Sequence, residues 1–269
     1  MKKSCVLIAL FFLPFLTIGQ NLRFEAKDSI VGNFSHFAVD NFGRIALVHN
    51  DVIISFSNIL DTLFSTSLKA FRPTSIESSK SFRTLIFDQE RSVIHFLDNT
   101  MTDIHGEIDL VNLDMQQPLL VCESFGGNTI WVLDAGSMRL IKLNENLEQV
   151  LITENLVTVF SNKNLPVQML EHNDFLFVLI PGTGVAIFDV FGTFIRIHHC
   201  EAKSIDVLNN YLILQNEKDI HAISYLKDDA PDQVFEIPDG TIQFKFTAEL
   251  VYFLTDKALI RGTYVAKDK

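Results

Sequence analysis

Residues 130–151, IWVLDAGSMRLIKLNENLEQVL, decide the fold. They contain three short apolar runs separated by two polar turns, the first of which includes Gly136. Apolar runs of about four to eight residues that are bounded by turn residues are typical of β-strands. No part of the stretch keeps the three-and-four spacing of an amphipathic helix. We therefore expect consecutive antiparallel strands joined by hairpins.

The same pattern of two apolar strands around a short turn occurs six times. The copies are IALVHNDVIISF from Ile45, TLIFDQERSVIHFL from Thr84, IWVLDAGSMRLIKL from Ile130, LFVLIPGTGVAIFD from Leu176, LILQNEKDIHAISYL from Leu212 and VYFLTDKALIRGTYV from Val251. Steps of 39, 46, 46, 36 and 39 residues separate the equivalent positions Leu47, Ile86, Val132, Val178, Leu214 and Phe253. This spacing is near the blade length of a β-propeller, which is about 40 to 45 residues.

Each copy is preceded by a further apolar strand, and most copies are followed by a more polar one. The preceding strands begin at Ser35, Pro73, Pro118, Pro166, Lys203 and Gly240, and following strands begin at Asp61, Glu148 and Thr193. Four strands in this order make one propeller blade. The predicted blades span approximately residues 35–70, 71–112, 116–156, 164–201, 202–238 and 239–265.

The two ends of the repeat array predict how the ring closes. The sixth copy ends at Val265, after its third strand, and residues 22–30 precede the first copy without a partner of their own. If residues 22–30 supply the missing outer strand of the last blade, the ring closes and the two exposed sheet edges of an open array are removed. The prediction is an all-β fold, a single six-bladed β-propeller over residues 20–269 whose N-terminal strand closes the last blade. A β-sandwich would not explain six equivalent spacings, and a β-helix would need shorter repeats.

The stretch 130–151, with a strand followed by Asp-x-Gly and a second strand ending in a polar turn, resembles the NHL and related six-bladed propeller repeats. The resemblance is one of architecture. The opening MKK and the residues TIGQ at 17–20 resemble export signals common in Bacteroidota, which implies a periplasmic or cell-envelope setting.

Residues 1–19 have the layout of a secretory signal peptide. Lys2 and Lys3 supply the positive start, and an apolar run from Cys5 to Leu16 is too short for a stable membrane anchor. A lipoprotein signal would place its cysteine at the far end of this run, whereas Cys5 lies at the near end. We expect cleavage after Gly19 and an exported, periplasmic or extracellular protein without a transmembrane anchor.

Charge and cysteine content narrow the possible partners. The formal net charge is −11, and loss of the two lysines of the signal lowers it to −13. Such a surface repels phosphate backbones and anionic lipid, so nucleic acid is not an expected partner. In the propeller, Cys122 would lie on an inner strand and Cys200 at the end of an outer strand of the next blade. These positions are too far apart for a disulfide, so we predict two free thiols.

The segment from His198 to Glu201 contains two histidines, a cysteine and a glutamate. Neighbouring residues on a strand point to opposite faces, so His198 and Cys200 could share a ligand set, while His199 could not join it. No second spaced pair accompanies them, and a half-exposed outer strand is the preferred interpretation.

Other motifs are also better explained by structure. FGGN from Phe125 and PGTG from Pro181 lack the lysine of a phosphate-binding loop and fit hairpin turns with positive φ. Trp131 could line an aromatic cleft, but packing between blades is the favoured prediction. Ser224 and Lys227 match S-x-x-K without its companion motifs.

Some six-bladed propellers are calcium-dependent lactonases with carboxylate and amide side chains at the mouth of the central channel. Carboxylates available for this role are Asp40, Glu77, Glu123, Glu171 and Asp206. They form no ordered ligand set, so the sequence assigns no catalytic or metal-binding residue and no binding site. The leading hypothesis is a non-catalytic binding or scaffolding module of the cell envelope, without a cofactor, that docks another envelope protein, a peptide or a glycan on the propeller rim. The alternative is a metal-dependent hydrolase or lactonase at the channel, which would require calcium.

Overall fold

The computed structural model describes residues 22–80, 83–125, 128–160, 164–227 and 232–266. The expected signal peptide, residues 1–19, lies outside them. Apart from a short 3-10 helix at Val111–Leu113, the regular elements of the described chain are β-strands. Within these residues, no helix reaches the length and apolar character needed to cross a bilayer.

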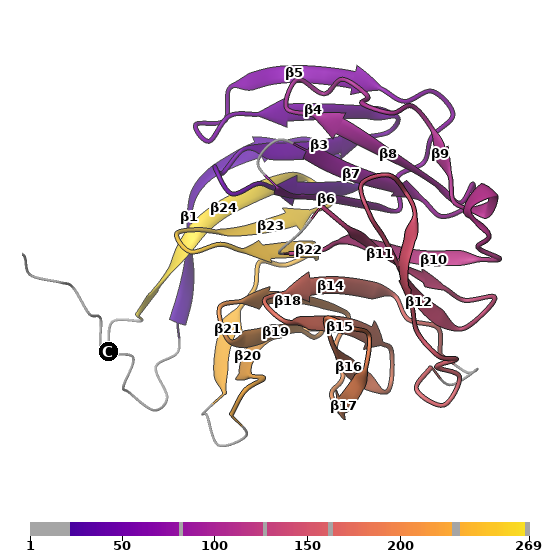
Figure 1. Ribbon diagram of the computed structural model, residues 1–269. Helices are drawn as coiled ribbons and strands as arrows, with labels where there is room; N and C mark the ends of the chain where they lie inside the picture. Colours follow the sequence, from indigo (N-terminus) through magenta and orange to yellow (C-terminus); the bar gives the residue numbers. More distant parts are fainter. Residues whose placement is uncertain (1–21, 81–82, 126–127, 161–163, 228–231, 267–269) are drawn as a thin grey trace, which may run out of the picture.

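The strands form six four-stranded blades arranged in a ring (Figure 1). Blade 1 contains β2 (His36–Val39), β3 (Ile45–His49), β4 (Val52–Phe56) and β5 (Thr62–Ser67). Blade 2 contains β6 (Ser75–Lys80), β7 (Arg83–Asp88), β8 (Val93–Asp98) and β9 (Ile108–Asp109). Blade 3 contains β10 (Pro118–Glu123), β11 (Ile130–Asp134), β12 (Arg139–Leu143) and β13 (Gln149–Ile152).

Blade 4 contains β14 (Gln168–His172), β15 (Phe175–Ile180), β16 (Gly184–Asp189) and β17 (Phe194–His198). Blade 5 contains β18 (Ser204–Leu208), β19 (Tyr211–Gln215), β20 (Asp219–Ser224) and β21 (Gln233–Glu236). Blade 6 contains β22 (Thr241–Phe246), β23 (Val251–Thr255), β24 (Ala258–Ala266) and β1 (Leu22–Val31). The predicted six-bladed, all-β propeller is confirmed.

The predicted closure by the N-terminal segment is also confirmed. Strand β1 pairs antiparallel with β24, from Leu22 opposite Ala266 to Val31 opposite Ala258 (Figure 1). Leu22 also pairs in parallel with Phe235 of β21, which joins blades 5 and 6 into one eight-stranded sheet. Gly262 permits this approach, because a Cβ at this position would lie 2.1 Å from the Glu25 carbonyl oxygen.

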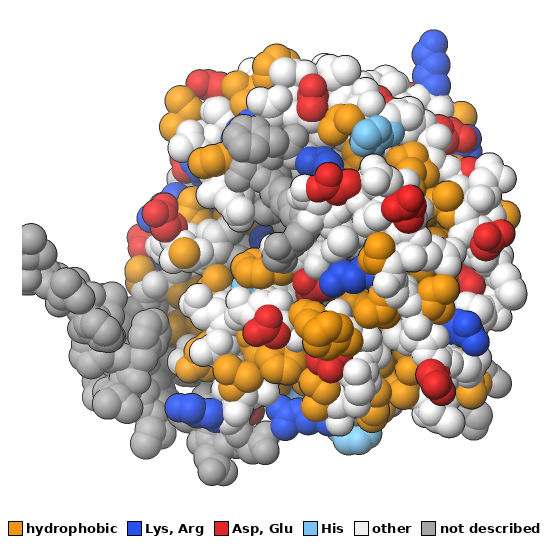
Figure 2. Space-filling model, in the orientation of Figure 1, with side chains coloured by type: hydrophobic (Ala, Val, Ile, Leu, Met, Phe, Trp, Pro, Cys, Tyr) orange, Lys and Arg blue, Asp and Glu red, His pale blue; other side chains and the backbone are white. Residues whose placement is uncertain are grey.

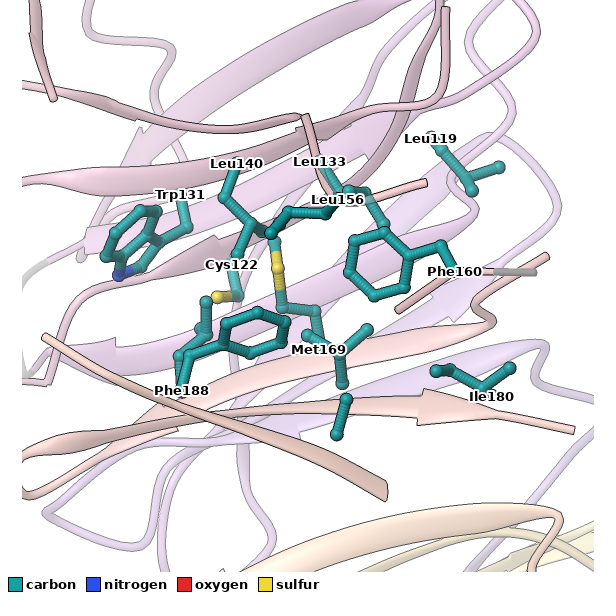
Figure 3. Packing of buried hydrophobic residues seen from close by; sticks show 13 residues of the cluster. Leu119, Cys122, Trp131, Leu133, Leu140, Leu156, Phe160, Met169, Ile180 and Phe188 are labelled. Atoms are coloured by element: carbon teal, nitrogen blue, oxygen red, sulfur yellow. The ribbon is translucent and has the colours of Figure 1, made fainter. Parts of the chain in front are cut away.

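The hydrophobic core lies between neighbouring blades. The second strands are buried on both faces over most of their length, as are the third strands of several blades, which explains their continuous apolar runs. Figure 3 shows the cluster between blades 3 and 4, where Trp131 and Cys122 face Met169 and Phe188. Burial of such large side chains is the main favourable contribution to folding. Trp131 is therefore part of the inter-blade core, as predicted.

Candidate functional site

Five turns of the ring share one design, which the sequence analysis missed. The side-chain oxygen of the first residue accepts hydrogen bonds from the backbone N–H groups of the third and fifth residues, and the fourth residue has a positive φ. These turns span residues 40–44, 57–61, 98–102, 144–148 and 189–193. Asp, Asn and Ser are favoured at the first position because their side chains replace a backbone acceptor. Each turn joins the first to the second or the third to the fourth strand, so all lie on one side of the ring, which we call the turn face.

The third residue of each turn forms its tip. In three turns the tip is a large apolar side chain: Phe42 is 59% exposed, and Ile59 and Phe191 are each 71% exposed. In blades 2 and 3 the same position holds Thr100 and Asn146, which are also exposed. The turn therefore forms with a polar tip, and the apolar residues are not required for folding.

The inner strands are tied together by side chains that bind the backbone of the next blade. In five blades a polar residue of the inner strand makes the contact. By strand register, His36, Gln168 and Gln243 occupy one position, and Glu77 and Asp206 lie two residues further along the strand. The contacts are His36 to Thr74, Glu77 to the Glu123 N–H, Gln168 to Ile205, Asp206 to the Phe246 N–H, and Gln243 to Phe37. Inner strands have backbone groups that no further strand pairs, and buried groups of this kind need partners. Blade 3 has the apolar residues Leu120 and Cys122 at these two positions, and Glu171 of blade 4 makes that junction instead by accepting from the Phe125 N–H.

Glu171, on inner strand β14, accepts several hydrogen bonds from residues of blade 3. Its carboxylate accepts hydrogen bonds from the Ser124 hydroxyl at 2.6 Å, the Phe125 N–H at 3.0 Å and the Trp131 indole N–H. The Lys142 ammonium lies 3.3 Å from the same carboxylate and 4.6 Å from the centre of the Trp131 ring. Glu171 therefore has a structural role that links blades 3 and 4.

Two further buried carboxylates of the inner strands, Glu123 and Asp206, also have basic partners. Arg83 contacts Glu123 at 2.8 Å, and Lys245 contacts Asp206 at 2.6 Å. Each pair joins adjacent blades, and each carboxylate is buried. Buried charges are tolerated when they are paired and hydrogen-bonded, so these contacts account for the carboxylates without a metal ion.

Glu77 differs from the other acids of the inner strands in its pKa. Burial raises the pKa of Glu77 to about 8, and the nearby Glu123 carboxylate acts in the same direction, while the Glu123 N–H opposes it. Glu77 is therefore largely protonated at neutral pH. Burial and the Lys245 ammonium lower the pKa of His172, which keeps this imidazole neutral beside the Phe125 ring at a centroid distance of 4.6 Å.

The candidate metal ligands do not come together. Asp40 lies in a turn of the turn face, where its carboxylate caps the turn and contacts Arg44, whereas Glu77, Glu123, Glu171 and Asp206 lie on inner strands. Over the described residues, no three His, Cys, Asp or Glu side chains gather at metal-binding spacing, at residues 198–201 or elsewhere. His199 instead contacts the Thr183 carbonyl.

The remaining sequence motifs have structural roles. Cys122 is buried and Cys200 half-buried, and neither is in a disulfide, as predicted. The PGTG segment forms the predicted turn, with φ of 69° at Gly182 and 130° at Gly184. Residues 126–127 of FGGN lie outside the described chain. The Ser224 hydroxyl accepts the Lys227 backbone N–H, so the two side chains do not form a catalytic pair.

Two hollows occur outside the turn face. One of 490 Å³ lies between blades 1 and 2 and is lined partly by Asn33, Asn50, Asp51 and Arg72. The other, of 390 Å³, includes Asp114, Arg139 and Ile152 in its lining. Figure 2 shows basic, acidic and apolar side chains intermixed over the visible face, without a region of one charge. These surfaces suit contacts with a polar or mixed partner surface more than with a highly charged ligand.

Comparison with solved structures shows that the chain shares its fold with known β-propellers. No protein-family model matches the chain, and no curated protein matches it. The WD40 β-propeller domain of Doa1 is similar, with a TM-score of 0.61 and 10% identity, over 93% of this chain and 94% of that chain. The WD40 domain of Neurospora crassa Pan2 has a TM-score of 0.59 and 11% identity, over 94% and 98% of the two chains. Virginiamycin B lyase from Staphylococcus aureus has a TM-score of 0.56 and 12% identity, over 84% and 79%. The protein is a β-propeller, and at these identities the similarity shows the fold alone.

Proposed function

We propose that this protein is a non-catalytic binding or scaffolding module of the cell envelope that docks another envelope protein on its turn face. The observation that supports the proposal is the set of exposed apolar tips, Phe42, Ile59 and Phe191, on turns whose equivalents in blades 2 and 3 have polar tips. The envelope setting rests on the expected export signal in residues 1–19, and the repeats are proposed to be of the NHL-like kind.

The tips suit protein docking because they are rigid as well as exposed. Two side-chain hydrogen bonds within each turn fix the backbone on both sides of the tip. A pre-organised apolar side chain loses little conformational entropy when a partner covers it. Residue 191 lies in blade 4, on the opposite side of the ring from residues 42 and 59 in blade 1. A partner that contacts both sides must span the channel mouth, which favours a folded protein over a short peptide or a glycan.

The alternative of a metal-dependent hydrolase or lactonase at the channel has less support. Glu123, Glu171 and Asp206 already accept bonds from basic side chains of the protein. A calcium ion would have to displace these partners, and it would need six to eight oxygen ligands. The similarity to virginiamycin B lyase does not favour an activity, because it extends to the fold alone.

The test begins with the partner. The mature chain is cross-linked in a native envelope preparation, the captured protein is identified and purified, and its affinity for the propeller is measured. We expect the combined variant Phe42→Thr, Ile59→Thr, Phe191→Thr to bind at least about tenfold more weakly, which corresponds to about 1.4 kcal/mol. Its melting temperature should remain unchanged, because these side chains are at solvent-exposed tips.

The matched control is Thr100→Asn, which exchanges one polar tip for the other polar tip found in this turn. We expect its affinity to equal that of the wild type. Equal binding by the triple variant would show that the turn-face tips are not the docking site. Hydrolysis of a lactone that depends on added calcium would instead support the alternative.

A further inference from the structure

Strand β5, at the outer edge of blade 1, has an unusual composition for a free strand. It reads TLFSTS, contains no charged residue or proline, and pairs with β4 alone. Five of its six residues are exposed, including Leu63 and Phe64. Figure 1 shows β5 along the outer edge of the ring, at the top of the view, with no described element outside it. Natural proteins usually block such edges with charges, proline or a covering element, because a free edge pairs with other strands.

The other outer strands of the described chain are blocked or shortened. Strand β9 has two residues, one of them Asp109, and β17 carries Arg196 at its centre. Strand β1 pairs with β21 at Leu22 and Phe235, and the rest of β1 carries the charged residues Arg23, Glu25, Lys27 and Asp28. Strand β13 is uncharged, but Glu148 and Glu154 flank it. Bulges do not distinguish these edges, because β5, β13 and β17 all have a register shift where they begin.

The register of β5 on β4 shows which backbone groups are available. The Leu68 N–H donates to the Asp51 carbonyl, and regular pairing continues to Phe64 opposite Ser55. In an antiparallel pair, residues that bond the neighbouring strand alternate with residues whose N–H and C=O groups point away from it. Because Leu68 bonds inward, Ser65 and Ser67 direct their backbone groups outward. These groups can extend the sheet.

We propose that two copies of this chain associate through β5, antiparallel, about a twofold axis at Ser65. In this register Phe64 of one copy lies opposite Thr66 of the other, and Leu63 lies opposite Ser67. Asp61 precedes the strand, and the exposed Lys69 follows it. The twofold axis brings Asp61 of each copy near Lys69 of the other, so both ends gain an opposite-charge contact. An antiparallel pairing of β13 about Leu151 would instead oppose Glu148 with Glu154, so the charges that flank β13 disfavour self-association whereas those that flank β5 favour it.

The pairing extends blade 1 into an eight-stranded sheet across two molecules. The twofold contact lies on the perimeter of the ring and includes Asp61 of the turn 57–61, whereas the turns that carry Phe42 and Phe191 lie outside it in both copies. Standard stable interfaces use about 20–30 residues from each partner. A contact built on a six-residue strand is smaller, and we expect a dimer that dissociates at micromolar concentrations.

Sedimentation velocity of the mature chain over a range of concentrations tests the proposal. We expect a monomer–dimer equilibrium in the wild type. Each single reversal, Asp61→Lys or Lys69→Asp, replaces attraction by repulsion at both ends and should weaken the dimer about tenfold. The double variant Asp61→Lys, Lys69→Asp restores opposite charges and should return the dissociation constant to within about threefold of the wild type.

Two additional measurements address the register and the fold. A zero-length carbodiimide cross-link should join Asp61 of one copy to Lys69 of the other, identified by the mass of the linked peptides. Glu148→Lys on β13 is the matched control and should leave the dimer unchanged. Circular dichroism and melting of each variant verify folding. A chain that stays monomeric, a dimer insensitive to both single reversals, or a double variant that fails to recover each overturns the proposal.

Discussion

Replacing Glu171 with glutamine should destabilise the protein by about 3 kcal/mol. The Glu171 side chain is 3% exposed and that of Lys142 is 14% exposed, so both charges are shielded from water. Glutamine keeps one acceptor oxygen, but its amide N–H₂ faces donors from Ser124, Trp131 or Lys142. Removing one partner of a buried pair costs about 3–5 kcal/mol, and we take the lower end because Lys142 retains some contact with water. For a chain of this size, each kcal/mol lowers the melting temperature by about 2–4 °C.

The assay is urea denaturation and calorimetry at neutral pH, with a melting temperature that we expect to fall by about 6–12 °C. Glu217→Gln is the control, because Glu217 and its partner Lys203 are 75% and 58% exposed, and exposed pairs contribute about 0–1 kcal/mol. Adding Lys142→Met to Glu171→Gln should recover much of the loss, since no unpaired charge remains. A loss below about 1 kcal/mol for Glu171→Gln, or an equal loss for Glu217→Gln, would refute this reasoning.

Two more predictions concern the channel and the ring closure. The folded-state pKa of Glu77, about 8, lies above its usual value of 4.5, so the folded state binds the Glu77 proton more tightly than the unfolded state. The resulting contribution to stability is fully present below pH 4.5 and is lost as the pH rises through 8. The free energy of unfolding of Glu77→Gln, relative to that of the wild type, should therefore rise between pH 4.5 and 8 by at most about 1.4 kcal/mol per pH unit. Urea titrations at several pH values measure this difference, and parallel pH profiles of the two proteins would contradict the prediction. Phe24 packs edge-on against Phe253 at 4.9 Å, so Phe24→Ala should cost about 2–3 kcal/mol in the same assay, while Arg23→Ala at an exposed neighbouring position should be near neutral. Equal effects of the two substitutions would contradict the role of β1 in closing the ring.

The turns of the turn face share a sequence feature that an analysis of strand periodicity does not detect. In each of the five turns, Asp, Asn or Ser stands three positions before a residue with positive φ, which is Gly43, Leu60, Met101, Leu147 or Gly192. Two of these residues are glycines, whose conformational freedom marks a turn, but three are not. The feature that all five turns share is the Asp, Asn or Ser at the first position.

The inner-strand contacts contained a second repeated signal. A polar residue recurs at one of two positions in five inner strands: His36, Gln168 and Gln243 occupy the first, and Glu77 and Asp206 lie two residues further along. The sequence analysis considered Glu77 and Asp206 only as possible metal ligands. Their backbone partners lie about one blade away in the sequence, for example 46 residues for Glu77 and 40 for Asp206. Such a distance follows from the ring, so the contacts could not be assigned before the blades were placed side by side.

The sequence by itself determined the strands, their grouping into six blades and the closure by residues 22–30. These features follow from local alternation, turn chemistry and the regular spacing of similar segments, which are properties of neighbouring residues. Only the tertiary structure decided which acids are neutralised by Arg83, Lys142 and Lys245, and which tips and strand edges remain uncovered. The ion pairs join residues of adjacent blades, and the exposure of a tip or an edge depends on whether another segment covers it. The sequence of one segment does not specify which distant segments will lie beside it.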